Sequence, residues 1–152
     1  MSTFNADDFL SATTSDSNST KIIPCPIGEY PAIIDKVVPR QWQSKDGTQS
    51  GIAVDVFWLV QDAGAQQVCG REQVSVKQGL MLDTNSNGGL DMSEGKNVPL
   101  GRLREAVGKN EPGQPFAFAM LPGLMAKISV NHRQDKNDPE LMYAEVKLVT
   151  KL

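Results

Sequence analysis

The chain has 152 residues, of which 39% are hydrophobic and 22% charged, a composition typical of a soluble globular protein with one domain. No apolar run approaches the roughly 18 residues that a membrane-spanning helix needs, and the N-terminal sequence MSTFNADDFL has neither the basic nor the apolar segment of a secretory signal. The net charge of −3 is not that of a strongly basic nucleic-acid-binding protein.

Residues 1–20 are rich in Ser, Thr, Asn and Asp and are predicted to form a flexible acidic arm. The arm holds three of the 18 acidic residues and no lysine or arginine, so residues 21–152 carry 15 acidic and 15 basic residues. These residues are predicted to form one neutral domain. A short apolar segment in the arm is interpreted either as part of a disordered tail or as a segment that docks on the body, another subunit or a partner: Phe4, Phe9 and Leu10.

Residues 29–38 alternate in hydrophobicity and are predicted to form a first strand. Lys36 interrupts its apolar face, which is otherwise formed by Tyr30, Ala32, Ile34 and Val38. The loop 39–50 then places an aromatic residue between two cations: Arg40, Trp42 and Lys45. This composition suits a nucleic-acid strand, through stacking and phosphate contacts. The alternative is a tryptophan that folds back on the end of the sheet.

Residues 51–60, GIAVDVFWLV, show the strongest strand pattern of the chain. The even positions from Ile52 to Val60 are wholly apolar and are predicted to face the core. The odd positions include Asp55, Phe57 and Leu59. An aromatic ring on the face away from the core can serve as a platform for a ligand. The alternative is that a helix or a subunit contact covers this face.

Residues 62–70 are predicted to form a turn-rich connector, and residues 71–77 a third strand with Val74 and Val76 pointing inward. The outward positions of this strand would place two cations beside the aromatic ring of the second strand: Arg71 and Lys77.

Residues 83–94 match the calcium-loop pattern D-x-[DN]-x-[DN]-G-x5-E at every specified position. That pattern needs a helix on each side. The preceding residues VSVKQGLML are strand-like, however, and Gly95–Pro99 should interrupt a following helix. Asn-Gly-Gly equally predicts a turn between two short strands. No metal site is therefore predicted, and calcium binding is kept as a separate hypothesis.

Asn97 is predicted to cap a short helix near residues 98–107, and two strands follow at residues 123–133 and 141–149. In the last strand, Val146 and Leu148 are expected to face inward. A polar loop, 134–140, joins the two strands. Outward-facing cations and one aromatic ring of this region are candidate ligand contacts: Lys127, Arg133, Lys136, Tyr143 and Lys147.

Five strands with one helix between the third and fourth are the element order of the OB-fold, a five-stranded Greek-key barrel. This fold binds oligonucleotides on strands two and three and in the loops that join strands 1–2 and 4–5. The candidate DNA-binding residues lie on or near these elements: Lys36, Arg40, Trp42, Lys45, Phe57, Arg71, Lys77, Lys127, Arg133, Lys136, Tyr143 and Lys147.

The segments GEYPAIIDKV, GREQVSVKQG and KNVPLGRLREAVG resemble those of small bacteriophage OB-fold proteins described as single-stranded DNA-binding proteins. The resemblance extends over nearly the whole chain, including FNADDFL in the arm. It implies a non-enzymatic role, coating single-stranded DNA during phage replication, recombination or repair in the cytoplasm of the infected bacterial host. Candidate partners are phage replication or recombination proteins and further copies of the chain.

The resemblance also implies that residues 83–94 are a family loop and not a calcium site. One departure is the C-terminus, Val149-Thr150-Lys151-Leu152. Many single-strand binders end in an acidic tail that recruits partners, and this chain does not.

The alternative function is an OB-fold protein-interaction module, a phage structural or host-modulating factor without nucleic-acid binding. The neutral body and the apolar pair Phe57 and Leu59 favour it. An enzyme is not expected, because the sequence has no nucleophile elbow, phosphate loop or dinucleotide fingerprint and its one histidine, His132, has core-side parity. No cofactor is expected either, since Cys25 and Cys69 lack a zinc-site spacing and are predicted to be reduced thiols.

Overall fold

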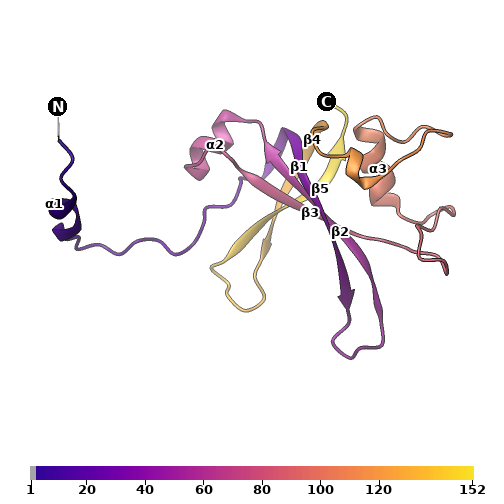
Figure 1. Cartoon of the computed structure of the whole chain (residues 1–152), viewed down its shortest axis with the longest axis horizontal. Helices are drawn as coiled ribbons and strands as arrows, with labels where there is room; N and C mark the ends of the chain where they lie inside the picture. Colours follow the sequence, from indigo (N-terminus) through magenta and orange to yellow (C-terminus); the bar gives the residue numbers. More distant parts are fainter. Residues whose placement is uncertain (1–2) are drawn as a thin grey trace.

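A five-stranded sheet that closes on itself forms the body of this computed structural model, which describes residues 3–152 (Figure 1). The strands are β1 (Gly28–Gln43), β2 (Ser50–Val60), β3 (Ser75–Met81), β4 (Met125–Gln134) and β5 (Met142–Thr150). Their order is β1-β2-β3-β5-β4, and β4 pairs with β1 to close the sheet. Only one pair, Lys77 and Glu145, joins β3 to β5, so the closed sheet is not an even barrel. The predicted mainly-β class with five strands is confirmed.

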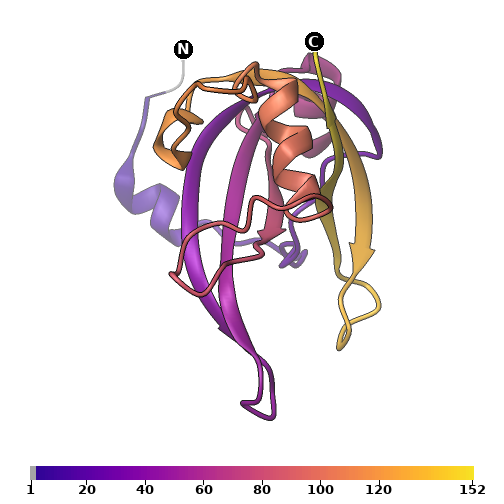
Figure 2. The same cartoon turned by 90° about the vertical axis from the view of Figure 1, so that its right-hand side faces the viewer.

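The helices of the described residues are short: α1 (Ala6–Ser11), α2 (Ala63–Cys69), α3 (Val98–Ala106) and a 3₁₀ turn, η1 (Phe118–Met120). None of them is long and apolar enough to cross a membrane. As predicted, a helix lies between the third and fourth strands. This helix, α3, buries Leu100 and Leu103 against the sheet and lies across one opening of it (Figure 2).

The predicted connector over residues 62–70 is wrong, because this segment forms α2. Asp62 caps the helix by accepting the Ala65 amide at 2.9 Å, and Gly70 ends it in the left-handed conformation. The helix occupies the chain up to Cys69, so β3 begins at Ser75, four residues later than the predicted strand. Val74 and Val76 are buried as predicted.

Trp58 is at the centre of the core, as the alternation along β2 predicts. Its side chain is fully buried, and its indole Nε1 donates a hydrogen bond of 3.0 Å to Oε1 of Gln78 on β3. Val54, Val56 and Val60 of the same strand face are also buried. Because an indole N–H without a partner is costly inside a core, Gln78 is the polar residue that makes a buried tryptophan possible here.

Two β-bulges change which residues face the core. Asp35 is an extra residue in β1, so Lys36 pairs with Phe57 on the outer face. The predicted inward position of Val38 is therefore wrong: Val38 is 41% exposed, and Val37 packs against the core instead.

The second bulge is in β5, where Lys147 is the extra residue between the pairs Ser129–Leu148 and Val130–Val146. Leu148 is therefore 46% exposed and Val149 is buried, which corrects the predicted inward position of Leu148. A one-residue insertion moves every following side chain to the opposite face of the strand.

The N-terminal arm extends away from the sheet and carries α1 at its far end (Figure 1). Asn5 caps this helix by accepting the Asp8 amide, and the rings of Phe4 and Phe9 lie 6.2 Å apart. Phe4, Phe9 and Leu10 are 78%, 70% and 80% exposed, so the apolar segment does not pack on the body. That the arm is flexible stays a prediction.

Candidate nucleic-acid interface

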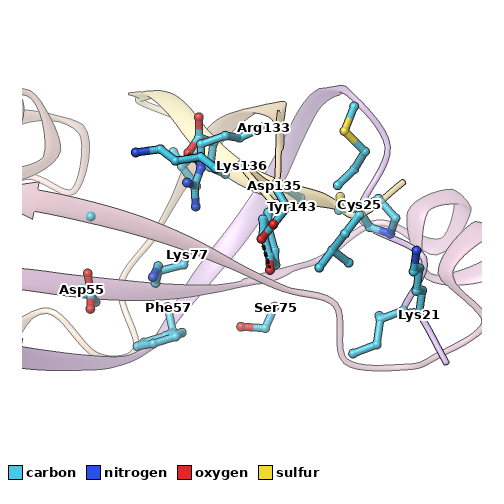
Figure 3. Close-up of a pocket in the computed structure, with 18 of the residues that line it drawn as sticks. Lys21, Cys25, Asp55, Phe57, Ser75, Lys77, Arg133, Asp135, Lys136 and Tyr143 are labelled. Atoms are coloured by element: carbon cyan, nitrogen blue, oxygen red, sulfur yellow. Dashed lines mark hydrogen bonds and ion pairs between the residues drawn. The ribbon is translucent and has the colours of Figure 1, made fainter. Parts of the chain in front are cut away.

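A groove of about 1140 Å³ runs between the outer face of β2 and β3 and the β4–β5 hairpin. Figure 3 shows Phe57 and Lys77 on the β2–β3 side, facing Arg133, Lys136 and Tyr143 from the hairpin. The β1–β2 and β4–β5 hairpins project to the same side of the molecule, so the groove opens between these two hairpins (Figures 1 and 2).

The first wall of the groove has an aromatic ring between two lysines. Lys36, Phe57 and Lys77 occupy paired positions on β1, β2 and β3, so their side chains share one face. The Lys36 ammonium lies 4.9 Å from the centre of the Phe57 ring, within range of a cation–π contact. The bulge at Asp35 makes this row, because it turns Lys36 outward.

The opposite wall pairs Arg133 with Tyr143 across β4 and β5, and the guanidinium lies 5.5 Å from the centre of the ring. The Tyr143 hydroxyl donates to Asp135 Oδ2 at 3.0 Å, and this hydrogen bond raises the pKa of Tyr143. The Asn137 amide and the same hydroxyl lower the pKa of Asp135. Arg133 also pairs with Glu145 at 3.3 Å, so the second ring is held in place by charged neighbours.

Residues 20–22, 24 and 25 line one end of the groove. Lys21 pairs with Asp138 at 3.1 Å and Glu140 at 3.2 Å, in and beside the loop between β4 and β5. These carboxylates raise the pKa of Lys21, Asp138 contributing most. Arg71 donates to the Ile23 carbonyl at 3.0 Å from the other side. The base of the arm thus bridges both walls, a role for Lys21 that no local pattern indicates.

The groove is basic although the protein is acidic. In the described part of the chain, six cations and three carboxylates line it, for a net charge of +3 against −3 for the whole chain. Three of the cations have no carboxylate within ion-pair distance among residues 3–152: Arg71, Lys77 and Lys136. This excess of positive charge favours an anionic ligand over a cationic one.

Seven of the predicted site residues line this groove: Arg40, Phe57, Arg71, Lys77, Arg133, Lys136 and Tyr143. Lys36 reaches it through its contact with Phe57. Lys45 is exposed near the tip of the β1–β2 hairpin, and Lys127 pairs with Glu29 at 3.5 Å, outside the groove. Lys147, the bulge residue of β5, does not line the groove either.

Trp42 lies outside the groove on the β1–β2 hairpin, where it lines a separate cavity of about 520 Å³. It pairs with Gly51, and a Cβ atom at Gly51 would lie 2.7 Å from the indole Nε1. Glycine is therefore needed there for the indole to rest on the neighbouring strand. Because Trp42 and Arg40 are two residues apart on one strand, they share a face of β1, although only Arg40 lines the groove.

Asp55 lines the groove but is not among the predicted site residues. It is 7% exposed, and its Oδ2 accepts a 2.9 Å bond from Nε of Arg40. The signal that points to it is its strand position, two residues from Phe57 on the same face.

The calcium-loop residues do not converge on a cation site. Asp83 and Asn97 exchange hydrogen bonds between side chain and backbone, and Asp91 accepts from Ser93. Asn85 accepts the Asn87 amide in a turn. Within residues 3–152, no group of three or more His, Cys, Asp or Glu residues could hold a metal ion. The loop lies between β3 and α3, without the helix that the motif needs before it.

Cys25 lies at the arm end of the groove, and its carbonyl lies 2.7 Å from Nε2 of His132. The histidine therefore has the structural role that its parity predicts, with Nε2 carrying the proton, because a carbonyl only accepts. The thiol of Cys25 is 1% exposed. This burial raises its pKa from 9.0 to about 11, and nearby Cys69 adds to the shift.

The pKa of Cys25 predicts a loss of stability in alkali. The Cys25 thiol has a pKa of 9.0 in the unfolded chain and of about 11 in the folded protein. Its neutral form therefore contributes its full stabilisation below pH 9.0, and this contribution is lost as the pH rises through about 11. Under reducing conditions, the thermal midpoint should fall across this window, and it should fall less steeply for Cys25→Ala. Equal slopes for the two proteins would contradict this assignment.

The groove combines aromatic rings with cations, the two kinds of side chain that surfaces for single-stranded nucleic acid use. No model of a known protein family matches this chain, and no curated protein is significantly similar to it. The functional inference therefore rests on the groove itself.

Proposed function

We propose that this chain binds single-stranded DNA in the groove, without strong sequence specificity, during phage DNA replication, recombination or repair. The observation that carries the proposal is a groove of net charge +3, with aromatic rings on both walls, in a protein of net charge −3. The strand order β1-β2-β3-β5-β4 and a helix between β3 and β4 support an OB-fold, whose ligands bind on strands two and three.

The two walls suit a single strand better than a duplex. Phe57 and Tyr143 present rings on which unpaired bases stack, at about 1–3 kcal/mol per base. Paired bases in a duplex have no free face for this contact. Arg71, Lys77 and Lys136, which have no carboxylate partner among residues 3–152, can contact the phosphates that follow the bases.

Titration of a fluorescently labelled oligo(dT) of about 30 nucleotides, long enough to exceed one site, tests the proposal. Each phosphate neutralised on a single strand contributes a slope of about −0.7 to log K against log salt, so the three cations without a carboxylate partner predict a slope of roughly −2. Duplex DNA of equal length should bind much more weakly. An affinity for single strands that is undetectable at low salt, or no greater than that for duplex, would refute the proposed function.

A second candidate function, a protein-interaction module, is favoured by one observation. The arm exposes Phe4, Phe9 and Leu10, which do not pack against the rest of the described chain. This function predicts self-association or partner binding that buries Phe57 and is indifferent to nucleic acid. Sedimentation of the protein with and without oligo(dT) separates the two functions.

A further inference from the structure

One oxygen of the Asp55 carboxylate has no hydrogen-bond partner in the described part of the chain. Oδ2 accepts from Arg40, but Oδ1 is buried and unpaired among residues 3–152. A buried acceptor without a donor destabilises a protein, and such groups are rare in folded chains. In a surface that holds a ligand, an unpaired acceptor points to a donor on that ligand.

The position of Asp55 places this oxygen beside a stacking ring. Figure 3 shows Asp55 on the same wall as Phe57 and Lys77. Residues two apart on a strand face lie about 7 Å from each other, which is within the reach of one base. Gly79 pairs with Asp55 on β3, and a Cβ atom there would lie 3.5 Å from Oδ1, so the β3 residue next to this oxygen leaves space for it. Because Oδ1 is buried, the Asp55 side chain must turn into that space to meet a base.

We propose that Asp55 Oδ1 accepts a hydrogen bond from the exocyclic amino group of one base stacked near Phe57. The groove then prefers cytosine, adenine or guanine over thymine at one position, although the rest of the strand is bound without regard to sequence. This inference rests on the proposed function and adds a specificity-determining residue to the same site.

The chemistry of the carboxylate excludes the backbone as its partner. A carboxylate only accepts hydrogen bonds, and it repels phosphate, which has no donor at neutral pH. The exocyclic amino groups of cytosine and adenine donate hydrogen bonds, which the carboxylates of Asp and Glu can accept. Thymine has the O4 acceptor where cytosine has its amino group. Because Oδ1 is buried from solvent, the bond to an amino group is offset little by the loss of a bond to water.

The test compares two strands that differ only at the edge of the base: oligo(5-methyl-dC) and oligo(dT), each of about 30 nucleotides. The wild type should bind oligo(5-methyl-dC) about tenfold more tightly than oligo(dT), because only the former offers an amino group for one charge-assisted hydrogen bond. In Asp55→Asn the two affinities should become similar, because the amide can turn either its oxygen or its NH₂ group to the base.

Asp135→Asn is the matched control. It removes the same charge from the same groove, but both oxygens of Asp135 already accept hydrogen bonds. This variant should bind both strands more tightly by a similar factor and keep the wild-type ratio. Gly79→Val should reduce the ratio without any change of charge, because its side chain would stand between Oδ1 and the base. Circular dichroism confirms that each variant is folded.

Equal binding of both strands by the wild type, or a ratio that Asp55→Asn leaves intact, would overturn the inference and leave single-strand binding standing. If neither strand binds the wild type, the proposed function itself fails. Displacement of the strand by dCMP at concentrations comparable to those of the oligonucleotide would assign the acceptor to a free nucleotide and would also overturn the inference.

Discussion

Replacing Trp58 with alanine is expected to lower the free energy of unfolding by about 3–5 kcal/mol, the largest effect of any single substitution on the core. The fully buried indole fills the centre of the closed sheet, and the small side chain would leave a cavity there. It would also leave Oε1 of Gln78 without its donor. Urea unfolding followed by circular dichroism measures the change. Trp42→Ala, on the projecting hairpin, is the control and should cost much less.

A double-mutant cycle separates the volume of Trp58 from its hydrogen bond, and it remains informative if the alanine variant does not fold. Trp58→Phe keeps most of the ring but removes the donor, and Gln78→Leu removes the acceptor. Each should cost about 1–3 kcal/mol, because each leaves one buried polar group unpaired. The double variant should cost less than the sum of the two. Additive costs would show that the hydrogen bond does not couple the two residues.

Replacing Phe57 with alanine is expected to weaken binding of oligo(dT) by about 1–3 kcal/mol, roughly five- to 150-fold, because one stacking platform is lost. The ring is only partly buried, and it lines the groove between Lys36 and Lys77. Fluorescence anisotropy at fixed salt measures the change. The salt slope should stay that of the wild type, since no cation is removed.

Leu59→Ala is the matched control for this effect. Leu59 lies two residues along β2 on the same face and is also partly buried, but it does not line the groove. Its variant should bind oligo(dT) like the wild type, whereas Phe57→Tyr should retain most of the affinity because it keeps the ring. Equal binding by the Phe57→Ala variant and the wild type would place the site elsewhere on the protein.

Some of the predicted DNA-binding residues lie outside the groove, because a strand pattern does not predict which strands face each other. Lys127 has the predicted outward parity and Lys147 is the extra residue of the β5 bulge, and both lie on parts of the sheet that do not line the groove. Parity gives the face of a strand and says nothing about which other strand that face meets. Lys21 shows the reverse case, because its role depends on Asp138 and Glu140, more than 100 residues away.

The sequence by itself determined the mainly-β class, the helix before β4 and the buried face of β2, because each follows from local periodicity. The predicted cap of that helix is not formed, since the Asn97 side chain bonds to the backbone of Asp83 and Asp91 instead. Only the tertiary structure decided the bulges at Asp35 and Lys147, the joining of seven predicted residues in one groove, and the unpaired oxygen of Asp55. The physical reason is that these features depend on how strands pair across the closed sheet. Residues distant along the chain set that pairing, and no local window of sequence contains it.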